Sequence, residues 1–172
     1  MTYLEALALW HDTDKSTHGY CPHYERFIGD MRLLPITMVE IGVASGASLR
    51  LWREWMPNAK IYGFDMNGYS GDDFTVIRGH QGEANDLERL LQECRLFHLI
   101  IDDGSHASDD QKVSFNTLWP RVVKGGWYVI EDSFGIGSCL DLNRIGNGDG
   151  DIDELHLIAD NRGNVILFLK KK

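Results

Sequence analysis

The sequence predicts an α/β fold in which a mostly parallel sheet carries helices on both faces and ends in a C-terminal antiparallel hairpin. Short apolar, β-branched runs alternate with segments whose apolar residues recur at helical spacing, and the connections between them are short. Near the end of the chain this alternation gives way to two strand-like runs separated by turn residues. The length of 172 residues and the apolar content of 43% fit one globular domain, residues 1–172.

The helices are recognised by apolar spacing and by the prolines that stop them. Leu87, Leu90 and Leu91 recur at helical spacing, and Pro57 and Pro120 each follow a segment expected to be helical. Two further helices are expected in a cap segment over residues 1–34, ahead of a sheet core over 35–172. The expected helices are Tyr3–Trp10, Tyr24–Leu33, Ser48–Trp55, Glu83–Cys94 and Asp109–Leu118.

The strands are recognised by apolar and β-branched composition. The continuous apolar runs ahead of Asp102 and Glu131 suit central positions of a parallel sheet, because such strands are buried on both faces. Lys124-Gly125-Gly126 is expected to form the turn before the second of these runs. The expected strands are Ile36–Gly42, Lys60–Asp65, Phe74–Arg78, Phe97–Asp102, Trp127–Glu131, and the hairpin strands Leu155–Ala159 and Val165–Leu169, joined through residues 161–164.

Charge and hydropathy exclude several classes of partner. The formal net charge of −9 disfavours a nucleic-acid backbone as the main partner. The sequence contains no apolar run of the roughly 18–20 residues that a membrane span needs, and no basic region precedes the apolar residues after Met1. We therefore expect a cytoplasmic protein without membrane contact. Cys21, Cys94 and Cys139 show no spacing typical of a disulfide framework or a zinc site.

A glycine-containing turn after the first strand is a candidate nucleotide site. Gly42 and Gly46 flank Ser45 and allow a ligand to approach the backbone closely, and the N–H groups of the next helix start there. Asp65 ends the second strand, about 20 residues further on, where an acid can accept hydrogen bonds from a ribose diol. Glu40 lies inside an apolar run, so it needs a polar partner, either the backbone of the turn or a cationic ligand end.

Carboxylates end two of the central strands. Asp103 follows the strand that ends at Asp102, and Glu131 and Asp132 end the next one. Because the ends of neighbouring parallel strands meet at one edge of a sheet, these three acids are expected to converge on one hard cation such as Mg²⁺. His106, close behind Asp103, is then a candidate general base, with a reference pKa of about 6.5.

These residues resemble the class I S-adenosylmethionine-dependent methyltransferases, whose sheet is Rossmann-like. Glu40-Ile41-Gly42-x-x-Ser45-Gly46 is similar to their first motif, and Asp65 to their ribose-binding acid. The pair Asp103-Gly104-Ser105-His106 and Val129-Ile130-Glu131-Asp132 resembles the metal-dependent sugar O-methyltransferases of macrolide and related antibiotic biosynthesis. So does the run Thr13-Asp14-Lys15-x-x-His18-x-Tyr20-x-x-x-Tyr24.

The resemblance implies roles for particular residues. Asp103, Glu131 and Asp132 would bind magnesium, and His106 would be the general base. Gln81 and Asp102 would lie near the adenosine. The segment that carries Lys15 and Tyr20 would close over cofactor or substrate.

The predicted function is a Mg²⁺-dependent transfer of a methyl group from S-adenosyl-L-methionine to a hydroxyl of a sugar or glycosylated small molecule. The ion would lower the pKa of the hydroxyl, and the protein would mainly supply positioning. Two alternatives stay open: an NAD-dependent oxidoreductase of similar fold, and a methyltransferase-like protein that binds cofactor without turnover. A homo-oligomer is possible.

The acidic run from Gly146 to Glu154 resembles a calcium loop, but Ile152 falls where an EF-hand needs glycine, so we expect a mobile loop beside the acceptor site.

Overall fold

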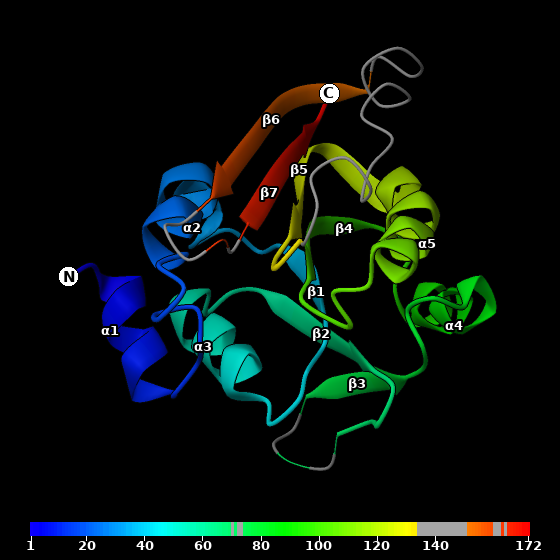
Figure 1. The fold of residues 1–172 in the computed structure, drawn as a ribbon, viewed down its shortest axis with the longest axis horizontal. Helices are drawn as coiled ribbons and strands as arrows, with labels where there is room; N and C mark the ends of the chain where they lie inside the picture. The colour runs from blue at the N-terminus through cyan, green and yellow to red at the C-terminus, as the bar shows by residue number, and fades with distance from the viewer. Residues whose placement is uncertain (70, 72–73, 134–150, 160–162, 164) are drawn as a thin grey trace.

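The computed structural model describes residues 1–69, 71, 74–133, 151–159, 163 and 165–172. Figure 1 shows a central twisted sheet flanked by helices. The helices are α1 (Tyr3–Trp10), α2 (Cys21–Ile28), α3 (Ala47–Trp55), α4 (Ala84–Glu93) and α5 (Ser108–Leu118), with 3₁₀ turns at Gly29–Met31 and Trp119–Arg121. The strands are β1 (Thr37–Ile41), β2 (Lys60–Asp65), β3 (Thr75–Arg78), β4 (Phe97–Asp102), β5 (Val122–Ile130), β6 (Ile152–Ala159) and β7 (Val165–Lys171).

The sheet has seven strands in the order β3-β2-β1-β4-β5-β7-β6. β1 to β5 are parallel, and β7 runs antiparallel between β5 and β6. The predicted fold class is therefore confirmed, including the C-terminal hairpin. The carboxyl ends of β1, β2, β4 and β5 lie at the same edge, which is where the candidate site residues gather.

The two faces of the sheet bury separate apolar cores. Leu99 and Ile101 of β4 face a core shared with α1, α2 and α3, whereas Ile100 between them faces a core shared with α4 and α5. The side chains of β7 alternate in the same way, because successive side chains of a strand point to opposite faces of the sheet. Helices thus cover both faces, as Figure 1 shows with α1 to α3 on one side and α4 and α5 on the other.

Most element boundaries agree with the expectations to within a few residues, with two corrections. The second helix spans Cys21–Ile28 rather than Tyr24–Leu33, and a 3₁₀ turn follows it. Pro22 lies in its first turn, where a missing N–H costs nothing. The expected turn at Lys124–Gly126 is wrong, because these residues lie inside β5. The register between β4 and β5 shifts there, and Gly125 takes a φ of +76° that a bulged strand can use.

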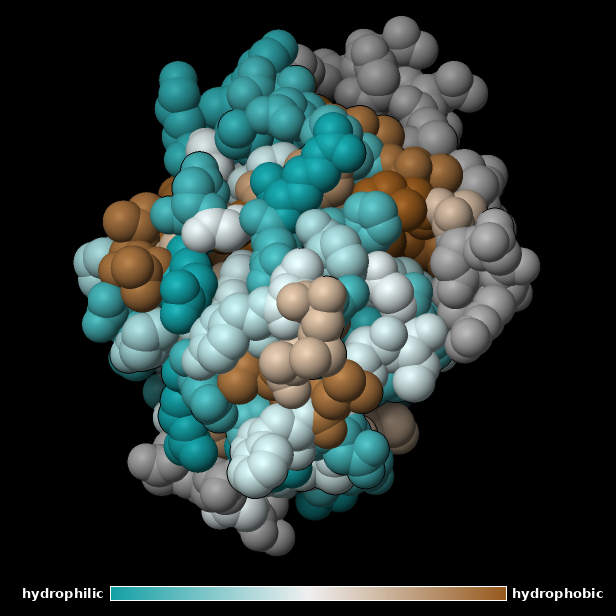
Figure 2. Space-filling model, turned by 90° about the vertical axis from the view of Figure 1, so that its left-hand side faces the viewer, coloured by the Kyte–Doolittle hydropathy of each residue, from teal (hydrophilic) through white to brown (hydrophobic). Residues whose placement is uncertain are grey.

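The surface over α1 and α2 mixes polar and apolar residues. In Figure 2, which looks at the molecule from that side, hydrophilic residues divide the hydrophobic ones into several patches. Trp10 and Leu9 at the end of α1 are among the exposed large apolar side chains, at 80% and 61% exposure. No helix in the part of the chain that the structure describes is long and apolar enough to cross a membrane.

Candidate active site

The turn after β1 is held tightly against the turn after β4. Gly42 takes a φ of +86°, and a Cβ built on it would lie 2.0 Å from the carbonyl oxygen of Asp103. Gly46 takes a φ of +75° and its Cβ would lie 2.5 Å from the Tyr69 hydroxyl. Both positions therefore need glycine, for the backbone conformation and for space.

Asp65 holds the same turn from the end of β2. Its Oδ2 accepts hydrogen bonds from the backbone N–H groups of Val43 and Ala44, at 2.9 and 3.1 Å, and its Oδ1 accepts one from Asn67 at 2.8 Å. Asp65 thus fixes the glycine turn while it also lines a cavity, where it remains partly accessible.

A cavity of about 510 Å³ opens at this edge of the sheet. Its volume lies in the range of small-molecule sites. Six of the predicted site residues line it, namely Gly42, Ser45, Asp65, Gln81, Asp103 and His106, together with Asp12, Thr13 and Asp14 from the connection between α1 and α2. The other predicted residues, Lys15, Tyr20, Glu40, Gly46, Asp102, Glu131 and Asp132, are not among its lining residues.

Asp102 supports the wall of this cavity from behind. It is fully buried and accepts hydrogen bonds from Gln81 Nε2 at 2.9 Å, from Tyr128 at 3.3 Å, and from the Ser114 hydroxyl. Burial raises the pKa of Asp102 to about 6. Gln81 accepts in turn from the backbone N–H of Ser105 at 2.7 Å, so Asp102 orients a cavity residue without reaching the cavity itself.

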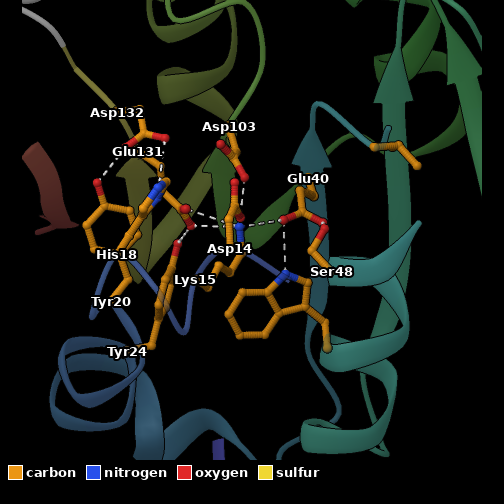
Figure 3. A network of polar contacts seen from close by, with 12 residues as sticks. Asp14, Lys15, His18, Tyr20, Tyr24, Glu40, Ser48, Asp103, Glu131 and Asp132 are labelled. Atoms are coloured by element: carbon orange, nitrogen blue, oxygen red, sulfur yellow. Dashed lines mark hydrogen bonds and ion pairs between the residues drawn. The ribbon is translucent and has the colours of Figure 1, made fainter. Parts of the chain in front are cut away.

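Lys15 lies at the centre of a buried ionic network, drawn in Figure 3. Its side chain has 0% exposure, and its Nζ lies 2.8 Å from Asp103 Oδ2, 3.0 Å from Glu131 Oε1 and 3.4 Å from Glu40 Oε1. Burial alone would lower the pKa of Lys15, but the three carboxylates outweigh it and raise the pKa well above its usual value. The ammonium group therefore links acids at the ends of β1, β4 and β5.

Glu40 finds its polar partners in α3 as well as in Lys15. Ser48 Oγ donates to its Oε2 at 2.7 Å, and Trp52 Nε1 donates to its Oε1 at 3.1 Å. Full burial nevertheless raises the pKa of Glu40, against the opposing effect of Lys15. The sequence indicated either the backbone of the turn or a cationic ligand end as the partner of Glu40. The structure places a cation beside Glu40, but this cation is the ammonium group of Lys15.

The two acids after β5 are each held by a tyrosine. The Tyr24 hydroxyl donates to Glu131 Oε1, and the Tyr20 hydroxyl donates to Asp132 Oδ1 at 2.6 Å. Burial raises the pKa of Glu131 well above its usual value. His18 Nδ1 lies 3.7 Å from Asp132 Oδ2. Together with Lys15, four side chains from the α1–α2 connection and α2 therefore converge on the carboxylates (Figure 3).

His106 pairs with Asp103 beside the cavity. Its Nε2 lies 3.2 Å from Asp103 Oδ1, and this hydrogen bond raises the pKa of His106. Although burial alone raises the pKa of Asp103, Lys15 and His106 hold it below its usual value. One ligand atom each from Asp103, His106 and Asp132 lies within 4.8 Å of the others, close enough to hold a metal ion.

This cluster shares two members with the predicted metal set. The prediction named Asp103, Glu131 and Asp132; the measured cluster contains His106 in place of Glu131, whose carboxylate is engaged by Lys15 and Tyr24. Asp103 and Asp132 lie together in this cluster, and Glu131 shares Lys15 with Asp103.

Backbone strain also concentrates at this edge. Among the described residues, the non-glycine positions with positive φ are Asp12, Ala44, His106 and Asp132, at 56°, 47°, 58° and 49°. Three of them line the cavity and the fourth belongs to the cluster. Such conformations cost free energy and persist where surrounding structure imposes them, often at functional sites.

Some of these features were not assigned from the sequence. His18 and Tyr24 stand in the motif between Thr13 and Tyr24 but received no individual role, and Trp52 lies in the helix expected over Ser48–Trp55 without a role of its own. The clustering of polar and aromatic residues in that motif is the signal that could have identified them. Residues 146–150 of the expected acidic loop lie outside the described residues, and Ile152–Glu154 begin β6.

Several curated proteins are similar in sequence. The chain is 36% identical over 141 residues to 8-demethyl-8-(2-methoxy-alpha-L-rhamnosyl)-tetracenomycin-C 3'-O-methyltransferase of Streptomyces olivaceus, covering 75% of this chain and 36% of that protein. It is 40% identical over 125 residues to mycinamicin VI 2''-O-methyltransferase of Micromonospora griseorubida, covering 67% of this chain and 31% of that protein. The chain thus spans about a third of the length of these relatives.

A solved structure and a family model agree with these relatives. MycE, a methyltransferase from the mycinamycin biosynthetic pathway solved in complex with Mg, SAH and mycinamycin VI, superimposes with a TM-score of 0.84 at 30% identity. The match covers 99% of this chain and 54% of that one. The sequence model of a family described as a methyltransferase domain matches residues 39–133, which is more than half of the chain. The chain therefore belongs to this methyltransferase-domain family.

Proposed function

We propose that this chain carries an S-adenosylmethionine-dependent O-methyltransferase activity toward a hydroxyl of a sugar or glycosylated small molecule, with Mg²⁺ as the metal. One observation carries the proposal: Asp103 and His106 belong both to the cavity and to the carboxylate cluster. A methyl donor in the cavity and an acceptor hydroxyl at the cluster would therefore meet at these two residues. The similarity to sugar O-methyltransferases supports the same acceptor class.

The residues present fit a divalent cation of the Mg²⁺ type. Asp103 and Asp132 place carboxylate oxygens in one cluster, and Glu131 lies beside them in contact with Lys15 and Tyr24. Carboxylate oxygens are the donors that hard cations prefer. We assign the ion to these three acids and keep His106 as the base. When bound, the ion would supply positive charge that lowers the pKa of an acceptor hydroxyl, and S-adenosylmethionine would supply the methyl group.

The chain's own residues would then orient the reactants and move one proton. Asp65 would accept hydrogen bonds from the ribose, while it keeps the glycine turn in place. His106 would remove the hydroxyl proton, and its contact with Asp103 would stabilise the resulting imidazolium. Lys15, Tyr20 and Tyr24 would hold the carboxylates at this edge of the sheet before the ligands arrive.

Hydride transfer with NAD is not favoured. The turn after β1 carries Ala44 where a dinucleotide fingerprint has glycine, and an oxidoreductase has no use for the acid cluster. A protein that binds the cofactor without turnover is the alternative that the experiment must exclude.

Calorimetric titration of S-adenosylhomocysteine is the direct test. We expect one-to-one binding to the protein, lost in Asp65→Ala and unchanged in Asp109→Ala, a matched variant of an acid with a 96% exposed side chain. Glycosides would then be screened for methyl transfer with Mg²⁺ and with EDTA. No binding of S-adenosylhomocysteine would refute the proposal, and binding without transfer to any glycoside would favour the non-catalytic alternative.

A further inference from the structure

Two buried side-chain atoms stand out because they lack a hydrogen-bond partner within the described part of the chain. They are Thr13 Oγ1 and His18 Nδ1, and both belong to the connection between α1 and α2. Buried polar groups are nearly always paired, because an unpaired one costs free energy of unfolding. His18 Nδ1 faces Asp132 Oδ2 at 3.7 Å and His18 does not line the cavity, whereas Thr13 does, so Thr13 Oγ1 is the atom that a ligand in the cavity would pair.

Thr13 is placed at the wall of the cavity by its own backbone. Its N–H donates to the carbonyl of Ala8 at 3.0 Å, and its carbonyl accepts from Ser16 Oγ at 3.0 Å. Two residues later, Lys15 fixes the connection to Asp103. Thr13 is 7% exposed and lines the cavity, and its hydroxyl has no hydrogen-bond partner among the described residues.

The order of the strands indicates which part of a cofactor would reach Thr13. Asp65 lies at the end of β2, and Asp103 at the end of β4, with β1 between them. With the ribose at Asp65 and the adenine beside Gln81, the other end of the nucleoside would lie against the glycine turn after β1 and the connection that Lys15 anchors, both of which line the cavity. In S-adenosylmethionine that other end is an amino acid, with an ammonium and a carboxylate group.

We propose that Thr13 is a cofactor-binding residue whose Oγ1 hydrogen-bonds the amino-acid end of S-adenosylmethionine. A hydroxyl can donate to the carboxylate or accept from the ammonium group. The proposal rests on the proposed function, since it presumes this cofactor. It assigns the connection between α1 and α2 to cofactor recognition, with Lys15 as its anchor.

The test compares Thr13→Val with wild-type protein in calorimetric titrations of two ligands. S-adenosylhomocysteine carries the amino-acid end, whereas 5'-deoxy-5'-methylthioadenosine lacks it. We expect Thr13→Val to bind S-adenosylhomocysteine about 10- to 100-fold more weakly, the range for a hydrogen bond to a charged group, and to bind methylthioadenosine as the wild type does. Equal weakening of both ligands, or no weakening, would overturn the proposal.

Stability provides the second readout. Because valine has nearly the shape of threonine and removes an unpaired polar group, the ligand-free Thr13→Val protein should melt at the wild-type temperature or above it. Thr17→Val is the matched control: Thr17 lies in the same connection, is exposed, and donates to the Asp14 carbonyl at 2.8 Å. It should keep full affinity and lose at most a little stability. A Thr13→Val protein that melts lower and binds normally would assign Thr13 a structural role instead.

Two further comparisons keep the outcomes separate. A second pair of variants, Thr13→Ser and Thr13→Ala, repeats the test with smaller side chains that differ only in the hydroxyl. Only Thr13→Ala should lose affinity for S-adenosylhomocysteine. If wild-type protein binds neither ligand, the proposed function itself is wrong and this proposal falls with it. If wild type binds S-adenosylhomocysteine and Thr13→Val binds it equally well, only the assignment of Thr13 is refuted.

Discussion

Replacing Lys15 by methionine should destabilise the protein far more than removing an ordinary lysine. Methionine keeps most of the length of the side chain but removes the ammonium group from Asp103, Glu131 and Glu40, at distances of 2.8, 3.0 and 3.4 Å. With an effective dielectric constant of about 20, each contact is worth about 5 to 6 kcal/mol of gross attraction. Burial of the ions cancels much of this, and removal of one partner of a buried pair costs about 3–5 kcal/mol.

Urea denaturation followed by circular dichroism measures this loss. With a slope of about 2 kcal/mol per molar urea, the midpoint should fall by about 1.5 to 2.5 M. Lys112→Met is the matched control, because Lys112 forms an exposed pair with Asp109 at 3.1 Å and should contribute less than about 1 kcal/mol. Adding Glu40→Gln to Lys15→Met should restore part of the loss, since one uncompensated carboxylate disappears. Equal midpoints for the two methionine variants would refute the reasoning.

Three further predictions concern the site and its turns. His106→Ala should abolish methyl transfer while Mn²⁺, followed by electron paramagnetic resonance, binds as before; a loss of Mn²⁺ binding would make His106 a ligand instead of the base. Tyr20→Phe should weaken Mn²⁺ binding about tenfold, because Asp132 loses the donor that orients it at 2.6 Å, and a change within twofold would contradict this. Gly42→Ala should lower the free energy of unfolding by about 3 kcal/mol or more, because the new Cβ would lie 2.0 Å from a carbonyl oxygen. Gly29→Ala is the control, because nothing lies within 4 Å of a Cβ at that position. Equal melting temperatures for the two variants would refute the steric argument.

The fold and the edge that carries the site were predictable from local patterns. Apolar runs that end in Asp102 and Glu131 identify central parallel strands, and parallel strands bring their carboxyl ends together. The glycine turn after β1 and Asp65 after β2 follow from the same rule. The start of β5 was missed, because Lys124-Gly125-Gly126 has the composition of a turn, whereas Val122 ahead of it already pairs with Phe97 of β4.

The burial of Lys15 could not be derived from its own sequence neighbourhood. A lysine between Asp14 and Ser16 has the local composition of a solvated turn, and lysine is rarely fully buried without a partner. Its partners come from β1, β4 and β5, so its position is decided by tertiary structure. The same holds for Glu40, whose need for a partner was evident while the identity of that partner was not.

The contacts of the α1–α2 connection have a consequence for the order in which the molecule folds. Lys15 meets Asp103 and Glu131 across 88 and 116 residues of sequence, and Tyr20 meets Asp132 across 112. Contacts of such long range form late, because the loop they close is costly in entropy. During synthesis the first helices must therefore wait until β5 has left the ribosome before the ammonium group and the carboxylates can neutralise one another. If Lys15 variants lose their stability through slower refolding, these ionic contacts form before the rate-limiting barrier. If they lose it through faster unfolding, the contacts form after the barrier.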